Sequence, residues 1–161
     1  MAKTKDGFTV YYNQFKHKIY NYFLYRIGFD QKAAEDLTSE AFLKALKSFA
    51  DFDEERPFGP WIFAIAHNHL VNYYKIANRE TTLTDKENFL PQTDDSASER
   101  LELERVIKLI QTMEAADREV LLLRFVDGLS NTEIAELLNK EEGAVRTQIS
   151  RAMAKLRELL K

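Results

Sequence analysis

The chain has 161 residues, 45% of them hydrophobic and 30% charged, and it carries a formal net charge of −3. With only five glycines and three prolines, this composition favours a folded, helix-rich protein and excludes disorder along the whole length. The absence of cysteine excludes disulfides and thiolate metal sites, and no apolar run reaches the roughly 20 residues that a membrane-spanning helix needs. No apolar stretch follows the lysines of the opening MAKTKDGF, so we expect no signal peptide and a cytoplasmic protein without membrane insertion.

The first predicted helix carries apolar residues at steps of three and four, which places them on one helical face. They are Tyr12, Phe15, Ile19, Phe23 and Ile27. Gly28 follows the last of them, and a glycine at that place is a typical end of a helix.

The second predicted helix covers roughly Gln31 to Ala50. Its expected buried stripe is Phe42, Leu46 and Phe49, and three alanines allow a neighbouring helix to approach: Ala34, Ala41 and Ala45. Carboxylates occupy its early turns: Glu35, Asp36 and Glu40. Two explanations stay open for them, because they either favour the positive end of the helix dipole or form an exposed docking face for a basic partner.

The third predicted helix follows DFDEERPFGP, with Pro60 in its first turn. Its first six residues are almost wholly apolar and must be buried, and then the polarity changes. Steps of four, three and four place polar residues on one face: Asn68, Asn72, Lys75 and Arg79. Beside Tyr73 and Tyr74, such amides and cations suit contact with bases and phosphates, although an ordinary solvated face has the same pattern.

His67 and His69 raise the question of a metal site in the third helix. They are two residues apart, so on a helix they point to different faces, and we see no nearby carboxylate to complete a site. No nucleophile elbow, phosphate-binding loop or other catalytic motif occurs in the sequence. We therefore expect no catalytic residues, no metal and no cofactor, and we do not expect an enzyme.

Charge divides the chain into three regions. Residues 1–79 hold 11 basic and 9 acidic residues (+2), residues 80–100 hold 2 and 6 (−4), and residues 101–161 hold 10 and 11 (−1). The middle region is polar, contains one proline and has no sustained periodicity, as is typical of a linker. The prediction is an all-α protein with two small helical domains, 1–79 and 101–161, joined by a flexible acidic linker at 80–100.

The second domain opens with two predicted helices. Ser96 and Glu99 have capping-box spacing at the start of the first. Its expected buried stripe is Leu103, Val106, Ile107, Ile110 and Met113. Asp117 is placed to cap the next helix, REVLLLRFVD, which should end at Gly128.

The last two predicted helices are joined by a very short turn. Ser130 and Glu133 form a second capping box, and Leu129 and Ile134 occupy the positions of a hydrophobic staple. The small Ala135 suits a close helix crossing, and Asn139 can adopt the left-handed conformation that ends a helix. The final helix has its inward face at steps of four, three, four and three: Val145, Ile149, Ala152, Leu156 and Leu159.

This arrangement is a helix-turn-helix pattern, in which the second helix enters the major groove of DNA. From Gly143 to Lys161 five basic residues and one acidic residue give +4. The residues expected to face outward are Arg146, Thr147, Ser150 and Arg151. Arginine commonly reads guanine edges, and serine and threonine contact bases or phosphates. The alternative is a plain helical hairpin with a solvated face.

Both halves together resemble a known family. The first half contains AAEDLTSEAFLKALKSFADFD and RPFGPWIFAIAHNHLVNYY, and the second contains DREVLLLRFVDGLSNTEIAELLNKEEGAVRTQISRAMAKLREL. These stretches are similar to the sigma factors of bacterial RNA polymerase. More narrowly, they resemble the small extracytoplasmic-function group (group IV of the sigma-70 family), which has sigma region 2 and sigma region 4 only.

The resemblance implies a function that needs polymerase, and roles for particular residues. The chain would bind the polymerase core through the clamp helices of the largest subunit and the flap, recognise a bipartite promoter and promote DNA melting. The clamp-helix contacts would be Glu35, Asp36, Glu40 and Leu43. The contacts to the melted minus-ten strand would be Phe52, Asp53 and Asn68, with Asn72, Lys75 and Arg79 further along, and the final helix would read the minus-thirty-five element as duplex.

Members of this group are often held inactive by an anti-sigma factor, which the resemblance adds as a partner. Within the helix-turn-helix, three positions depart from the family pattern: Lys140 replaces an apolar residue, Glu141 a capping Ser or Thr, and Gln148 a frequent Arg. An alternative function is a stand-alone helix-turn-helix regulator of transcription. A metal-dependent hydrolase built around His67 and His69 is a third hypothesis.

Overall fold

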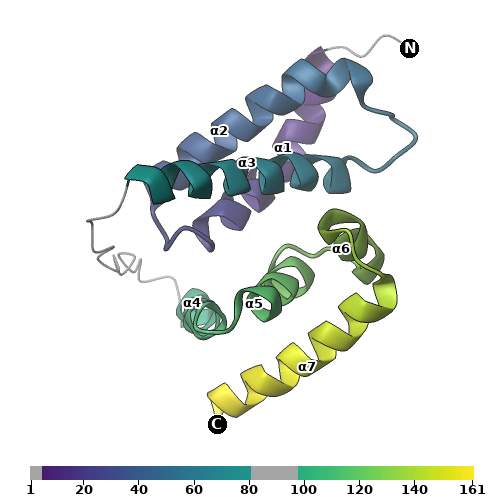
Figure 1. Cartoon of the computed structure of the whole chain (residues 1–161). Coiled ribbons are helices and arrows are strands. Elements are labelled where there is room, and N and C mark those ends of the chain that lie inside the picture. The colour runs from purple at the N-terminus through teal and green to yellow at the C-terminus, as the bar shows by residue number, and fades with distance from the viewer. Residues whose placement is uncertain (1–4, 81–97) are drawn as a thin grey trace. The chain divides into compact units, whose positions relative to one another are not determined.

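A computed structural model of the chain describes residues 5–80 and 98–161, and these residues form two compact units (Figure 1). The described residues contain helices and no strand, so the all-α prediction is confirmed. The predicted linker falls largely outside the described residues, as does the predicted capping residue Ser96, and the domain bounds stay a prediction. None of the described helices is long and apolar enough to span a membrane.

The first unit contains three long helices. They are α1 (Lys5–Leu24), α2 (Gln31–Ser48) and α3 (Phe58–Glu80), with one 3-10 turn, η1 (Phe49–Asp51), after α2. The middle helix packs against both others. The three alanines predicted to allow close approach, Ala34, Ala41 and Ala45, have no exposed surface. Pro60 lies in the first turn of α3, where its missing N–H costs no helical hydrogen bond.

The core of the first unit is rich in aromatic rings. Phe58 stacks on Tyr11 with ring centroids 4.3 Å apart, and Phe8 meets Phe49 edge-on at 5.3 Å. The largest fully buried side chains here are Tyr22, Phe23, Ile19 and Ile62. Because aromatic side chains bury large areas, this cluster dominates the cohesion of the unit.

In the first unit, Tyr12 and Leu46 of the predicted apolar stripes are more exposed than expected. Tyr12 is 39% exposed and its ring meets that of Phe42 nearly at right angles, with centroids 4.9 Å apart, while Leu46 of α2 is 40% exposed. Phe42, Ala45 and Phe49 already occupy the inward face of α2 and its 3-10 extension. Leu46 follows Ala45 by one residue and is therefore rotated to the side by about 100°.

The first helix ends in a left-handed turn. Regular α1 stops at Leu24, but Ile27 N–H still donates to Phe23 O at 3.0 Å. Gly28 then takes φ +74°, and Phe29 N–H donates back to Leu24 O at 3.0 Å. This six-to-one bond is the Schellman arrangement that a C-terminal glycine makes possible, so the predicted stop at Gly28 is confirmed.

The second unit contains four α-helices and one π-helical segment. They are α4 (Ser98–Gln111), α5 (Ala115–Leu121), the π-helical η2 (Leu122–Val126), α6 (Asn131–Leu138) and α7 (Glu142–Leu160). Four consecutive residues, 120–123, are completely buried, so the end of α5 and the start of η2 are surrounded by protein. Of the stripe predicted for α4, Ile107 and Ile110 are buried, whereas Leu103 is 43% exposed.

The start of α5 differs from the prediction. Glu114, not Asp117, occupies the N-cap position, and its side chain makes no capping hydrogen bond. Asp117 lies in the first turn of the helix, where it is 6% exposed and pairs with Lys155 of α7. The capping role predicted for Asp117 is therefore wrong, because a long-range ion pair engages the carboxylate instead.

The helix-turn-helix is formed by α6 and α7. Both bonds of the predicted capping box are present: Glu133 N–H donates to Ser130 Oγ at 3.1 Å, and Ser130 N–H to the Glu133 carboxylate at 3.0 Å. Asn139 ends α6 in the left-handed region at φ 56°, as predicted. Val145, Ala152 and Leu156 are buried and hold α7 against α5 and α6, while Leu159 near the chain end is 46% exposed.

Candidate nucleic-acid and protein interfaces

The outer face of α7 gathers the residues predicted to contact DNA. Arg146, Thr147, Ser150 and Arg151 are all exposed in the N-terminal half of the helix. The Arg146 side chain is 67% exposed and lies 3.7 Å from the carboxylate of Glu142, one turn earlier. So weak and exposed a pair leaves the guanidinium available to a stronger anionic partner.

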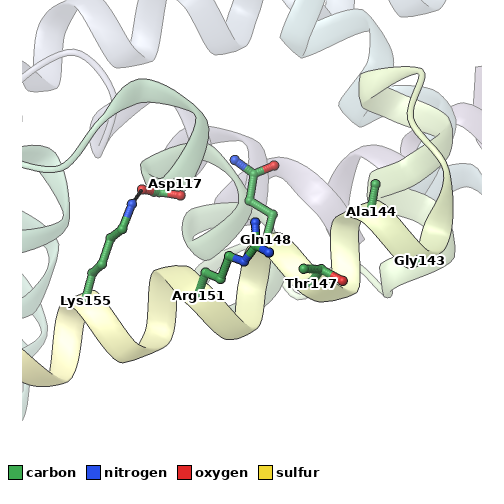
Figure 2. Close-up of a pocket in the computed structure, with 7 residues that line it drawn as sticks. All are labelled: Asp117, Gly143, Ala144, Thr147, Gln148, Arg151 and Lys155. Atoms are coloured by element: carbon green, nitrogen blue, oxygen red, sulfur yellow. Dashed lines mark hydrogen bonds and ion pairs between the residues drawn. The ribbon is translucent and has the colours of Figure 1, made fainter.

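An open groove of about 530 Å³ runs beside this face (Figure 2). Its lining residues on α7 follow one side of the helix over more than three turns: Gly143, Ala144, Thr147, Gln148, Arg151 and Lys155. From α5, Asp117 faces them across the groove. Thr147 and Arg151 belong both to this groove and to the predicted DNA-reading face, so the two surfaces are continuous.

The ion pair between Asp117 and Lys155 was not predicted. Lys155 Nζ donates to Asp117 Oδ2 at 2.8 Å, and the Asp117 side chain is only 9% exposed. This hydrogen bond, together with the charge of the carboxylate, raises the pKa of the Lys155 ammonium above its ordinary value. Helical spacing places Lys155 in line with Arg151, but only the packing of α5 on α7 identifies its partner 38 residues away.

Two of the three departures from the family pattern contact each other. Lys140, in the turn before α7, donates from Nζ to Gln148 Oε1 at 3.1 Å. The cation that the pattern usually carries on the helix is thus supplied here from the turn. The third departure, Glu141, is the N-cap residue of α7 and makes no side-chain capping bond.

The polar face predicted for α3 is exposed. Asn68, Asn72 and Lys75 lie outward at helical spacing, and Arg79 belongs to the same helix, although its side chain lies outside the described residues. This face can present amide donors and acceptors and a cation to a strand along the helix. Val71 and Ile76, 38% and 56% exposed, add apolar surface between the polar residues.

The two tyrosines beside this face are turned partly inward. Tyr74 Oη donates to the carbonyl oxygen of Arg26 at 2.6 Å, which ties α3 to the turn after α1. Burial, followed by the negative charge of Asp30, raises the pKa of the Tyr73 hydroxyl above its ordinary value. Both rings are half-buried, so they offer bases less stacking surface than the sequence suggested.

Phe52 and Asp53 in the loop before α3 have opposite environments. Phe52 is 2% exposed and its ring packs on Trp61 at 4.8 Å and on Phe58 at 5.6 Å. A side chain buried in this way has almost no exposed ring surface, and the DNA contact predicted for Phe52 stays a prediction. Asp53 is exposed, and its Oδ1 accepts from Glu55 N–H at 3.0 Å, which shapes the turn.

The acidic face predicted on α2 is exposed, and one of its members contacts α3. Glu35, Asp36, Glu40 and Leu43 all lie outward, with Leu43 57% exposed. Glu40 Oε2 lies 2.7 Å from His69 Nε2, and Lys44 Nζ lies 2.8 Å from the Nδ1 of the same ring. The imidazole is therefore held between two α2 side chains one turn apart.

The side chains of His67 and His69 do not face each other. His67 Nδ1 lies 3.3 Å from the buried Tyr22 hydroxyl, on a different side of α3 from His69. Glu40 of α2, which the sequence did not place near these residues, is in contact with His69. Even so, the described residues contain no cluster of three or more His, Cys, Asp or Glu side chains that could hold a metal ion.

Comparison with known proteins matches each unit separately. The family model for sigma-70 region 2 covers residues 11–80, and the model for sigma-70 region 4 covers residues 103–156. The chain is 34% identical to the ECF RNA polymerase sigma factor BldN of Streptomyces coelicolor, over 99% of this chain but 62% of that protein. It is 32% identical to the ECF RNA polymerase sigma factor SigW of Bacillus subtilis, over 98% of this chain and 90% of SigW.

A solved structure agrees with the described fold. The structure of CnrH in complex with the cytosolic domain of CnrY matches 98% of this chain and 89% of that chain, with 27% identity and a TM-score of 0.74. The likeness covers both helical units, and CnrH of Cupriavidus metallidurans is an RNA polymerase sigma factor.

Proposed function

The chain belongs to the extracytoplasmic-function group of the sigma-70 family, and from this premise we propose that it binds the RNA polymerase core and directs it to a bipartite promoter. The observation that carries the proposal is the presence of two sigma regions in one chain, each with its expected interface exposed. A helix-turn-helix alone would fit many DNA-binding proteins.

The second unit is proposed to read the minus-thirty-five element as duplex. Buried Val145, Ala152 and Leu156 anchor α7 from behind, which frees its opposite face for the major groove. Arg146 and Arg151 can donate bidentately to guanine edges, while Thr147 and Ser150 contact bases or phosphates. All four lie within two turns of the helix, a span suited to a few adjacent base pairs.

The first unit is proposed to hold the melted minus-ten strand. Asn68, Asn72 and Lys75 form an exposed row along α3, Arg79 continues it in sequence, and Asp53 lies in the preceding loop. Amides can bond the edges of unpaired bases while the cations contact the backbone. Phe52 packs on Trp61 and Phe58 at the start of α3, and we propose that it acts through this packing.

The acidic face of α2 is proposed to dock on the clamp helices of the largest polymerase subunit, with the flap as a further contact for the second unit. Glu35, Asp36 and Glu40 surround the exposed Leu43, so the surface combines negative charge with an apolar anchor. We also infer an anti-sigma factor as a regulator, which is supported by the capture of CnrH with a domain of CnrY.

Polymerase performs the chemistry in this proposal, so the chain itself is not an enzyme and needs no cofactor. Because its partners are polymerase and promoter DNA, we place its action in the cytoplasm. The rival function, a stand-alone regulator, requires neither the acidic face of α2 nor the polar face of α3.

The decisive experiment is reconstitution with polymerase core, followed by run-off transcription on a library of randomised promoters. The proposal predicts a stable complex and transcripts enriched for two short sequence elements at a fixed spacing. Duplex binding by the chain without a stable complex with core would favour the stand-alone regulator and reject the proposal.

A further inference from the structure

The groove beside α7 contains a cation that is already neutralised. Lys155 follows Arg151 by one turn on the same stripe, so both could approach the phosphates of a duplex lying along the helix. Lys155, however, is bonded to Asp117 at 2.8 Å (Figure 2). Of the charges lining the groove, Arg151, Lys155 and Asp117 together give +1 instead of +2.

The burial of Asp117 makes this pair hard to exchange. The Asp117 side chain is 9% exposed, whereas that of Lys155 is 58% exposed. If Lys155 swings out to a phosphate, a carboxylate with little access to water loses its partner, and such a loss costs far more than breaking an exposed pair. A phosphate that meets Lys155 without other contacts cannot offset that cost.

A second ion pair, at the end of α7, has both of its side chains exposed. Lys161 donates to Glu158 at 2.9 Å near the end of α7, but these side chains are 73% and 72% exposed. Both members stay hydrated, so this pair separates at little cost. Glu158 does not line the groove, which makes it a matched control for the removal of one negative charge from the unit.

We propose that Asp117 is a specificity-determining residue, which holds Lys155 away from duplex phosphates and thereby lowers sequence-independent binding along the groove. Non-specific affinity depends mainly on how many phosphates the protein neutralises, whereas specific affinity also has base contacts. Withdrawing one lysine therefore removes a larger share of the free energy of non-specific binding than of the free energy of specific binding. The inference rests on the proposed function, because it takes the α7 face as the surface that meets duplex DNA.

The test measures the salt dependence of binding to a short duplex of scrambled sequence, using the full chain. Asp117→Asn keeps the shape of the side chain but releases the charge of Lys155. We expect the slope of log affinity against log salt to steepen by about 0.9, the value for one further phosphate contact. Between 200 and 50 mM salt this change adds roughly a three- to fourfold gain in affinity.

Three further variants test whether the change in slope comes from Lys155. Adding Lys155→Gln to Asp117→Asn should return the slope to the wild-type value, and Lys155→Gln alone should leave the slope unchanged, because the lysine is already withdrawn. Glu158→Gln should also leave it unchanged. Helix content from circular dichroism establishes that each variant is folded, and the Lys155→Gln measurement stands even if Asp117→Asn fails to fold.

Three results would overturn the inference: an unchanged slope in Asp117→Asn, an equal steepening in Glu158→Gln, or a slope reduced by about one in Lys155→Gln. The first and third would mean that Lys155 is not withdrawn, and the second that only net charge matters. Promoter-specific transcription with any of these results leaves the proposed function intact. Asp117-dependent binding in a chain that never directs polymerase would reject the proposed function alone.

Discussion

Two carboxylates, one exposed and one buried, have different roles in this protein. Glu40 and Asp117 each contact a basic side chain of another helix, at 2.7 and 2.8 Å. Glu40 is 54% exposed, so its carboxylate stays hydrated when its contact with His69 is given up to a binding partner. Asp117 is 9% exposed and cannot lose Lys155 so easily. The first suits a docking residue, and the second suits a fixed element of the groove.

The partners of His69 also assign its tautomer. A lysine ammonium can only donate, so the Nδ1 of His69 must accept from Lys44. The proton of the neutral ring then lies on Nε2, from which it is donated to Glu40. This side chain, one of the two considered as metal ligands in the sequence, joins Glu40 and Lys44 of α2 to α3.

Phe52 provides a test at the residue scale. Phe52→Ala should lower the free energy of unfolding by about 3–5 kcal/mol, because it removes a ring from the contacts with Trp61 and Phe58. Trp61 is the only tryptophan of the chain, so its fluorescence in a urea titration reports the unfolding of the first unit.

Leu43→Ala is the matched control for Phe52→Ala, because Leu43 is 57% exposed and its truncation should change stability by less than about 0.5 kcal/mol. An unchanged stability in Phe52→Ala, with strand opening lost, would return Phe52 to the set of DNA contacts.

At the scale of elements, the two helices of the helix-turn-helix begin differently. Ser130 caps α6 with a complete capping box, whereas Glu141 has the extended backbone of an N-cap, φ −73° and ψ 144°, but no capping bond. A serine at 141 would reach the free N–H groups of the first turn without any change of backbone. The start of α7 is therefore suboptimal in the helix that is proposed to read DNA.

Glu141→Ser should raise the free energy of unfolding of the second unit by about 0.5–1 kcal/mol, and Ser130→Ala should lower it by about 1 kcal/mol. Thermal and urea denaturation followed by circular dichroism measure both changes. A loss of stability in Glu141→Ser would mean that the carboxylate interacts with the helix dipole more strongly than a hydroxyl cap would bond.

At the scale of the whole molecule, the two units are proposed to meet DNA in different states, duplex and single-stranded. Arg151→Ala should weaken binding of the upstream duplex by about 1–3 kcal/mol, through a lost contact to a base edge.

Asn68→Ala should lower strand opening by about fivefold, through a lost hydrogen bond of roughly 1 kcal/mol, while closed-complex formation is preserved.

Duplex binding, permanganate reactivity of unpaired thymines and association with polymerase core measure these three activities separately. Both variants should bind core normally, because neither residue lies on the acidic face of α2. If Arg151→Ala weakened core association as much as duplex binding, α7 would not be the reader of duplex DNA.

The sequence by itself determined most features that depend on neighbours within about four residues, although the cap predicted for Asp117 was wrong. It predicted the all-α class, the capping box at Ser130 and Glu133, the left-handed Asn139 and the outward position of Arg146 and Arg151, since helical periodicity and capping are local properties. The resemblance to sigma factors also rests on such local patterns, which is why it could be recognised before the fold.

Only the tertiary structure decided which distant side chains meet. The burial of Phe52, the contact of Glu40 with His69 and the withdrawal of Lys155 by Asp117 join residues far apart in the chain. Periodicity names the face on which a residue lies, but the partner across that face depends on how the helices are rotated and spaced. The side chains that tune this protein's contacts are therefore set by helix packing.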